Sequence, residues 1–427
     1  MKIKFKIKSG ALQFTVFIAV LIALLLAGLI LYAYTFIYMK EQSKGAIENI
    51  QLADLGIQTL LEQNNLSTDT SQLDFSKKQH QSISAHLSQW GIFQKGITIT
   101  QYRKKKFTKT ALIGSLINTE TSPTLFLQET HNALSLVGNT KITGNAYLPH
   151  QGVNSGYIAG NSYYGSQLIY GEEKKSTANL PAVDKNLVTS VTYYLKDFKI
   201  QRQEDFINLN SNIKITNSFK NQTKGFYSID PLIIANKIIS GNIIIKSESA
   251  IKVMKTAFLT DLILIAPIVE IEDGTTGNFQ VIASKKIVLG KNCNLRYPSA
   301  LMLYQNNKTD QQENTNIPFN NQIFMDTGTQ FKGTICYQQT KETPDFQTQI
   351  VLEKDAKIMG QVYCNGNFEL RGTVSGSVYT KQFMANQSGS IFVNHIYNGT
   401  IENEGIPAIY GGMPLEQEPK AVLKWLY

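Results

Sequence analysis

An uncharged stretch of 29 residues, from Ala11 to Met39, constrains this chain more than any other feature of its sequence. Its centre, residues 14–31, consists almost wholly of Leu, Ile, Val, Ala and Phe. About 20 apolar residues are enough for a helix to cross the hydrocarbon core of a bilayer. The apolar region of a cleaved signal peptide is shorter, about 7–15 residues, and ends at a small-residue cleavage site. The stretch therefore predicts one membrane-spanning helix over residues 11–38.

The charges on either side of this stretch predict its orientation. Four lysines stand within the first eight residues, at positions 2, 4, 6 and 8. Only Lys40 and Lys44 follow the stretch closely, and two glutamates dilute them. Because positive charge beside a span stays in the cytoplasm, we expect the N-terminus inside the cell. The sequence thus predicts a single-pass protein of the inner (cytoplasmic) membrane, held in the lipid bilayer by residues 11–38, with its head extracytoplasmic.

The span does not end cleanly where it should leave the membrane. Residues 39–64 hold good helix formers, no proline and two glycines. A loose apolar stripe runs through them, formed by Ile47, Ile50, Leu55, Leu60 and Leu61. Asn64 and Asn65 are suitable residues to stop a helix. We therefore expect one helix from Ala11 to about Gln63, half in lipid and half in a helical extension outside it.

This N-terminal segment resembles the type IV pilin and pseudopilin families. In those families a short basic leader ends in glycine, a prepilin peptidase cuts after it, and a long helix spans the membrane and then packs on a globular head. The resemblance implies a leader over residues 1–10 and cleavage between Gly10 and Ala11. It covers only about 53 residues and departs at the fifth mature residue, Thr15, where most pilins have glutamate. Some minor, large-headed pseudopilins also lack that acid. A plain, uncut signal anchor is the other interpretation.

The next segment, residues 65–128, is expected to be a small α+β region. Its first part, to residue 90, predicts a short helix and loops, and residues 91–116 alternate as two strands around a basic turn. The turn carries four consecutive cations, Arg103, Lys104, Lys105 and Lys106. A solvated hairpin tip would explain them. Contact with anionic lipid or a cell-wall polymer is the functional alternative, since each cation close to such a surface contributes about 1 kcal/mol.

From about residue 125 the pattern of apolar and small residues in the sequence changes. Short apolar runs alternate with Gly, Asn and Ser, and recur roughly every 18–24 residues, which is typical of a solenoid. β-Branched residues suit the inward positions of parallel sheets. We therefore expect a mainly β fold, in which the transmembrane helix is followed by an irregular β-solenoid over residues 129–412. Two insertions interrupt it, a side hairpin of alternating strands at 180–226 and a polar, protruding loop at 305–321.

The densest repeat pattern lies in the segment from Ala356 to Tyr379, AKIMGQVYCNGNFELRGTVSGSVY. It resembles the bactofilins, polymer-forming solenoids in which short strands ending in glycine stack into a compact β-helix. The likeness covers about 60–90 residues, and its motifs are generic to solenoids. Typical bactofilins are short and many are cytoplasmic, so self-polymerisation does not transfer to this longer chain. The whole arrangement is also similar to uncharacterised bacterial single-span proteins, a likeness that implies no function.

The charged residues do not indicate an enzyme. Four of the positive charges behind the net charge of +9 stand in the first eight residues, so the rest of the chain gives no argument for nucleic-acid binding. The best acidic cluster is Glu270, Glu272 and Asp273, either a solvated sheet face or oxygen ligands for Ca²⁺. No second acidic cluster stands at a repeat spacing, and no phosphate loop or nucleophile elbow occurs. We predict no catalytic residue, no metal site and no cofactor.

The histidines and cysteines are expected to be structural. His395 lies late in the solenoid without a six-residue period around it, and His80 and His86 show no known ligand spacing. Cys336 and Cys364 each follow a strand that starts with glycine, but they are offset by one residue in that frame. The offset favours opposite faces of the sheet. Buried thiols and a disulfide both stay open.

The C-terminal tail, residues 413–427, follows two glycines and is too apolar to extend into water. Its largest side chains include Leu423 and Trp425. A solenoid exposes an edge at each end, which invites pairing or covering. The tail is therefore expected either to fold over the last coil as a cap or to dock on a partner subunit.

Taken together, these features predict a non-enzymatic protein of the cell envelope. Its role would be structural, in assembly or in surface interaction, with protein partners or copies of itself. A minor pseudopilin of a pilus-like or secretion system is the more specific version. The alternative is a carbohydrate-active β-helix enzyme or a polysaccharide-binding protein. Three or more carboxylates in one groove would favour that alternative.

Overall fold

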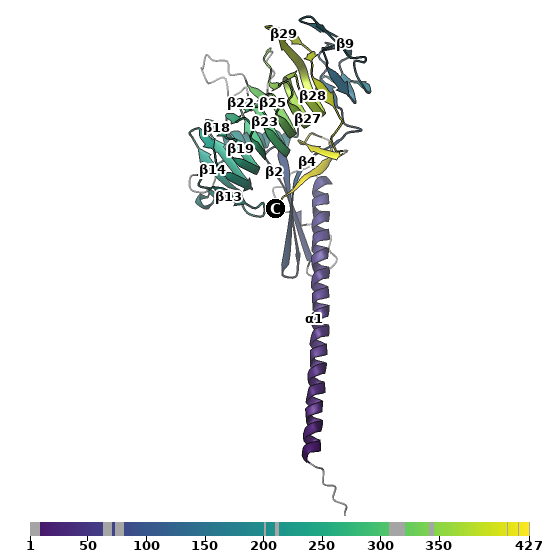
Figure 1. Ribbon diagram of the computed structural model, residues 1–427, viewed down its shortest axis with the longest axis vertical. Coiled ribbons are helices and arrows are strands. Elements are labelled where there is room, and N and C mark those ends of the chain that lie inside the picture. The colour runs from purple at the N-terminus through teal and green to yellow at the C-terminus, as the bar shows by residue number, and fades with distance from the viewer. Residues whose placement is uncertain are drawn as a thin grey trace, which may run out of the picture.

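The computed structural model describes residues 9–62, 71–72, 81–199, 202–209, 213–306, 321–340, 346–407, 409–416 and 418–426. They form one long N-terminal helix and a mainly β head (Figure 1). This part of the predicted fold class is confirmed. The leader lysines, most of the expected loop at 305–321 and His80 lie outside the described residues.

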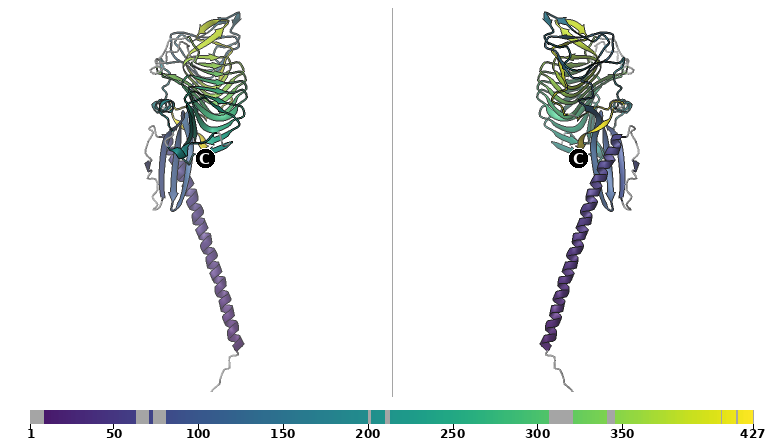
Figure 2. Two further views of the ribbon diagram at one scale, coloured as in Figure 1. Left: turned by 90° about the vertical axis from the view of Figure 1, so that its left-hand side faces the viewer. Right: turned by 90° about the vertical axis from the view of Figure 1, so that its right-hand side faces the viewer.

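Helix α1, Ser9–Glu62, is a single element of 54 residues. The helix is long and apolar enough to cross a membrane, and its most apolar window is not buried by the described residues of the head. Figure 2 shows this half of α1 projecting from the head as a free rod. The prediction of one continuous helix through the expected membrane surface is confirmed, because no proline interrupts the hydrogen-bonded turns.

The second half of α1 packs on the head through a face that combines small and large residues. Gly45, Asn49, Ala53, Gly56, Ile57 and Leu60 are all buried there. A Cβ added at Gly45 would lie 2.5 Å from the ring of Tyr102, and one at Gly56 would lie 2.4 Å from Thr98. The two glycines thus let a strand approach the helix closely.

This packing corrects the apolar stripe predicted for the extension. Ile47, Ile50 and Leu55 are 57%, 43% and 39% exposed, while Leu60 is buried and Leu61 packs at the edge of the contact. The prediction was based on large apolar side chains, whereas the observed contact depends on the close approach of the α1 backbone to the strands of the sheet. The helix therefore turns a face of mixed size toward the sheet and leaves these three apolar side chains outside.

An antiparallel sheet lies between α1 and the rest of the head. Its strands pair in the order β1-β2-β3-β4-β32, with β33 also on β4. They are β1 (Ser71–Gln72), β2 (Gln81–Trp90), β3 (Phe93–Tyr102), β4 (Lys105–Asn118), β32 (Ile409–Gly412) and β33 (Lys420–Leu426). The short helix expected before residue 90 is wrong for residues 81–90. There Ile83, Ala85 and Leu87 are buried in the period of two that a strand requires.

Most other strands join one closed, barrel-like network built largely from parallel pairs. Its members before residue 260 are β5 (Leu125–Leu127), β7 (Lys141–Thr143), β8 (Ala146–Leu148), β12 (Glu173–Lys175), β13 (Lys214–Asn217), β14 (Lys224–Ser228), β15 (Leu232–Ile234), β16 (Ile238–Gly241), β17 (Ile243–Ser247), β18 (Ala250–Val253) and β19 (Phe258–Ile265). The others are β20 (Ile268–Ile271), β21 (Thr276–Ala283), β22 (Lys286–Leu289), β23 (Asn294–Gln305), β24 (Gln322–Met325), β25 (Gln330–Gln339), β26 (Ile350–Leu352), β27 (Lys357–Leu370), β28 (Thr373–Gln387), β29 (Ser390–Val393) and β31 (Thr400–Glu402).

Two small sheets complete the strands. One consists of β30 (His395–Tyr397), β6 (Leu134–Val137) and β9 (Val153–Ser155), and the other of β10 (Tyr157–Ile158) and β11 (Asn161–Ser162). Two short helical segments are α2 (Lys185–Lys196) and the 3-10 turn η1 (Gln203–Asp205).

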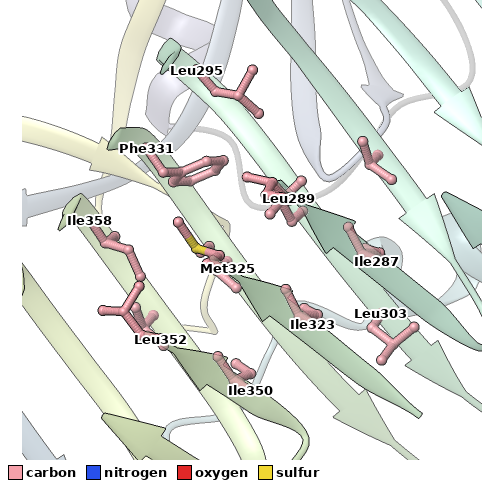
Figure 3. Close-up of a cluster of buried hydrophobic side chains, with 14 of the residues drawn as sticks. Ile287, Leu289, Leu295, Leu303, Ile323, Met325, Phe331, Ile350, Leu352 and Ile358 are labelled. Carbon is pink, nitrogen blue, oxygen red and sulfur yellow. The ribbon is translucent and has the colours of Figure 1, made fainter. Parts of the chain in front are cut away.

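Register aligns the core side chains of the parallel network in rows. Ile287 pairs with Ile323 and Ile323 with Ile350, so β22, β24 and β26 place isoleucine above isoleucine. The same three strands carry a second row, formed by Leu289, Met325 and Leu352. Strands β23, β25 and β27 carry a third, formed by Leu295, Phe331 and Ile358. Figure 3 shows these side chains gathered into one buried cluster. The rows form because a parallel register repeats each residue's face in the next strand.

Helix α2 corrects the side hairpin predicted within residues 180–226. Leu187, Val191 and Tyr194 recur every three or four residues and are all buried, which is a helical period. Asp184 caps the helix by accepting a hydrogen bond from the Asn186 N–H at 2.7 Å. The later strands β13 and β14 of this segment belong to the parallel network rather than to a hairpin of their own.

Buried glutamines join the antiparallel sheet to the parallel network. The side chain of Gln280 accepts from the Ile92 N–H at 2.9 Å and donates to the Trp90 carbonyl at 3.1 Å. Gln361 accepts from the Met413 N–H at 2.9 Å. A hydrophobic cluster that includes Trp90, Phe93 and strand residues of the network surrounds these contacts. The helix, the sheet and the network are thus linked by specific buried contacts.

Candidate functional site

The region where α1 meets the antiparallel sheet is the leading candidate site, because β3 runs along the helix toward its apolar half. Thr98 lies against Gly56, the Thr100 hydroxyl donates to the Asn49 carbonyl at 3.0 Å, and Tyr102 lies against Gly45. Each step along β3 therefore brings the strand nearer to the segment that could span a membrane.

The four predicted cations lie at the end of that strand. β3 and β4 pair from Tyr102 opposite Lys105, so Arg103 and Lys104 form a two-residue turn. Arg103 has a φ of 53° and its carbonyl accepts a hydrogen bond from the Gln101 side chain at 2.8 Å. All four basic side chains are exposed. Residues 103–106 are called the basic tip below.

Gly10 and Ala11, the predicted cleavage site, lie exposed in the first turns of α1.

Two carboxylates of the acidic cluster already accept hydrogen bonds from backbone N–H groups of neighbouring turns. A carboxylate oxygen of Glu272 accepts from the Lys255 N–H at 2.8 Å, and one of Asp273 accepts from the Lys291 N–H at 2.8 Å. Glu270 is exposed and lies opposite Lys252 in the parallel register. Among the described residues, no group of three His, Cys, Asp or Glu side chains could hold a metal ion.

The two cysteines considered for a disulfide are separate. Cys336 lies opposite Tyr363, and Cys364 lies opposite Tyr337, so the offset of one residue holds in the observed register. The two thiols belong to different hydrophobic clusters, and all three cysteines of the chain are free and buried. Burial raises the pKa of both the Cys336 and the Cys364 thiol. The buried-thiol alternative is the one observed.

His395 makes a structural contact, whereas the Nδ1 atom of His86 is buried without a hydrogen-bond partner among the described residues. The Nδ1 atom of His395 lies 2.7 Å from the Val393 carbonyl, and its ring packs near Phe392. His86 is half-buried on β2, where burial and then the charge of Lys95 lower its pKa. Neither faces a cluster of acids that would suggest catalysis.

The C-terminal tail does not fold over the end of the parallel stack. Residues 420–426 form β33, which pairs antiparallel with β4, so the cap prediction is wrong. Leu423 is buried, and Trp425 is half-exposed with the Lys109 ammonium 4.0 Å above its ring. Lys109 also forms an ion pair with Asp54 of α1. The tail thereby covers the open edge of β4 beside the helix, which satisfies its backbone groups.

One surface cleft was not predicted from the sequence. It has a volume of about 550 Å³ and a charged lining of Glu353, Lys354, Asp355, Lys357 and Arg371. Arg371 pairs with Glu353 at 3.0 Å and donates to Glu369 at 3.0 Å. The only signal available was the charge density within residues 353–371. Arg371 forms an ion pair with each of these two glutamates, which leaves Asp355 as the described lining carboxylate outside the arginine pairs.

No protein-family model and no curated protein matches the chain. Among solved structures, the chain is similar to the competence-associated pilin ComZ from Thermus thermophilus. The similarity covers 84% of this chain and 86% of that one, with 10% sequence identity and a TM-score of 0.24. A TM-score this low does not indicate a shared fold.

Proposed function

We propose that this chain is a membrane-anchored, extracytoplasmic protein of pilin-like architecture, with a structural or assembly role rather than a catalytic one. The observation that carries the proposal is the division of α1 into two halves. One half is apolar and left uncovered by the described residues, and the other packs on an antiparallel sheet through Gly45, Ala53 and Gly56. The apolar half of α1 would span the membrane, and the other half of the same helix would hold the head.

The head is inferred to be a β-solenoid that acts as a rigid spacer. Ile268 follows its parallel partner Ala250 by 18 residues, and Lys286 follows Ile268 by another 18. This spacing agrees with the repeat in the sequence. Stacked coils of this kind share one continuous core, because each coil packs on the next along its length. Such a head would present its surface at a fixed distance from the bilayer, available to protein partners, to further copies or to polysaccharide.

The non-enzymatic part of the proposal is supported by what the candidate acids do. Glu272 and Asp273 accept backbone hydrogen bonds at turns, and Glu353 and Glu369 pair with Arg371. A carboxylate already engaged in this way is a poor general base, because a hydrogen-bonded or ion-paired carboxylate resists protonation.

Cleavage of the leader tests the pilin-like part of this proposal. In cells that contain a prepilin peptidase, mass spectrometry of the purified protein is expected to find Ala11 as the N-terminus. Replacing Gly10 by valine should block the cut, because the leaders of that family end in glycine. Gly28→Ala, farther along the same exposed helix, should not.

The host's own pilin serves as the positive control in the same cells. If that pilin is processed while this chain keeps Met1 to Gly10, the pseudopilin interpretation is wrong. The interpretation as a plain signal anchor would then remain, and the head would have to act with partners other than a pilus-like system.

A further inference from the structure

The apolar half of α1 fixes where the membrane surface must lie. The 29 uncharged residues from Ala11 to Met39 would extend about 44 Å at about 1.5 Å per residue. A bilayer measures about 40–45 Å when its headgroup layers are included. If α1 spans the membrane as proposed above, Met39 therefore lies in the outer headgroup layer. Gly45 stands six residues, or about 9 Å, beyond it.

The basic tip lies at this same level. Tyr102 packs on Gly45, and the chain continues past Tyr102 toward the span before it turns at Arg103 and Lys104. Each strand residue adds about 3.3 Å, so the turn reaches to within about one helical turn of Met39. Figures 1 and 2 show the β3–β4 hairpin extending along α1, away from the rest of the head.

The charges at this level are strongly unbalanced. The tip contributes four exposed cations, and α1 adds Lys40 and Lys44, which are also exposed. Glu41 and Glu48 are the acids on the facing stretch of helix, and Glu48 already accepts a hydrogen bond from Gln81 at 3.2 Å. Within the described part of the chain, none of the four tip cations has a carboxylate partner. A polybasic surface next to a bilayer attracts anionic lipid over about one Debye length, about 8 Å at physiological salt.

We propose that the basic tip binds anionic phospholipid headgroups in the outer leaflet of the membrane that α1 spans. The inference rests on the proposed function, since it needs α1 in the bilayer. It names a second membrane contact that is distant in sequence from the first. Two contacts, one through α1 and one through the tip, would prevent the head from swinging about the end of the span. A lipid partner fits better than a wall polymer, because packing of β3 on α1 brings the cations within reach of the headgroups.

Spin labels on the full chain in nanodiscs test this proposal. The three native cysteines are buried, so a nitroxide can be attached to single introduced cysteines. Ser82→Cys, exposed and opposite Gln101, reports on the tip, and Ser390→Cys, on β29 at the far end of the head, is the control. Ala23→Cys reports whether α1 lies in the bilayer. The discs contain a nickel-chelating lipid in phosphatidylcholine, alone or mixed equally with phosphatidylglycerol.

Collision of the tip label with headgroup nickel is expected to rise by about twofold or more in the phosphatidylglycerol discs and to fall again in high salt. Replacing all four tip cations by glutamine should abolish the rise. The matched control replaces four exposed lysines of the head, Lys252, Lys255, Lys332 and Lys357, by glutamine, and should leave the rise intact.

Other outcomes overturn the proposal in distinguishable ways. A tip label that responds equally in both lipids, while the Ala23→Cys label shows bilayer burial, removes the lipid contact but keeps the proposed anchor. Failure of the Ala23→Cys label to enter the bilayer removes the proposed function as well. A tip label that ignores phosphatidylglycerol but is immobilised by soluble poly(glycerol phosphate) at physiological salt, in the native tip and not in the glutamine variant, would identify a wall polymer as the partner instead.

Discussion

Replacing Ile245 by aspartate is expected to abolish cooperative folding of the head. Ile245 is fully buried in β17, between Phe226 on one neighbouring strand and Leu264 on the other. An unpaired charge in such a site costs several kcal/mol, against a total stability of about 5–15 kcal/mol for most proteins. Thermal unfolding of the purified chain in detergent, followed by circular dichroism in the β region, measures the effect.

Ile233→Asp is the matched control for this experiment. Ile233 lies on β15, which pairs with β18, and is 66% exposed, so the same substitution there should change the melting temperature little. A melting temperature for Ile245→Asp close to that of the Ile233→Asp variant would show that β17 does not face the interior. The register of the parallel network would then be wrong.

Replacing Gly376 by alanine is expected to destabilise the head by roughly 3 kcal/mol or more. Gly333, Gly360 and Gly376 align in successive strands, each with a φ near 145° that side chains rarely adopt. A Cβ on Gly376 would lie only 1.8 Å from the Gly360 carbonyl oxygen. The backbone must shift to accept it, and the row of glycines transmits that shift to the next coil.

Gly389→Ala separates the two causes of this loss. Gly389 has a φ of 80°, but a Cβ added there would meet no atom within 4 Å. That variant carries backbone strain alone and should cost about 1–2 kcal/mol. Equal losses for both variants, measured by chemical unfolding, would mean that the close approach at Gly376 contributes nothing. The stacked glycines would then not be a packing requirement.

The long helix could be predicted because length, hydropathy and the lack of proline act locally. Its packing face could not, because Gly45 and Gly56 bury nothing that a hydropathy pattern detects. They matter only through the approach of Thr98 and Tyr102 from another element. The offset of Cys336 and Cys364 was predicted correctly, since a strand's period of two fixes which side chains share a face.

The incorrect predictions share one physical cause, which is that the affected segments contact residues far away along the chain. β33 pairs with β4 across about 300 residues, and no local pattern in the tail indicates that edge. Helix α2 was missed because its apolar residues also suit a strand, although the Asp184 cap was a usable signal. The basic tip was identified as a charge cluster, but its position along α1 comes only from the packing of Tyr102 on Gly45.

Cysteine labelling in spheroplasts tests the central claim, that α1 spans the membrane and the head lies outside. The native cysteines are buried, so the unaltered chain should stay unlabelled by a membrane-impermeant maleimide. Ser390→Cys should be labelled in intact spheroplasts. Lys4→Cys, in a host without prepilin peptidase, should react only after the membrane is permeabilised. The reverse pattern, with Lys4→Cys reactive in intact spheroplasts and Ser390→Cys protected, would contradict the account.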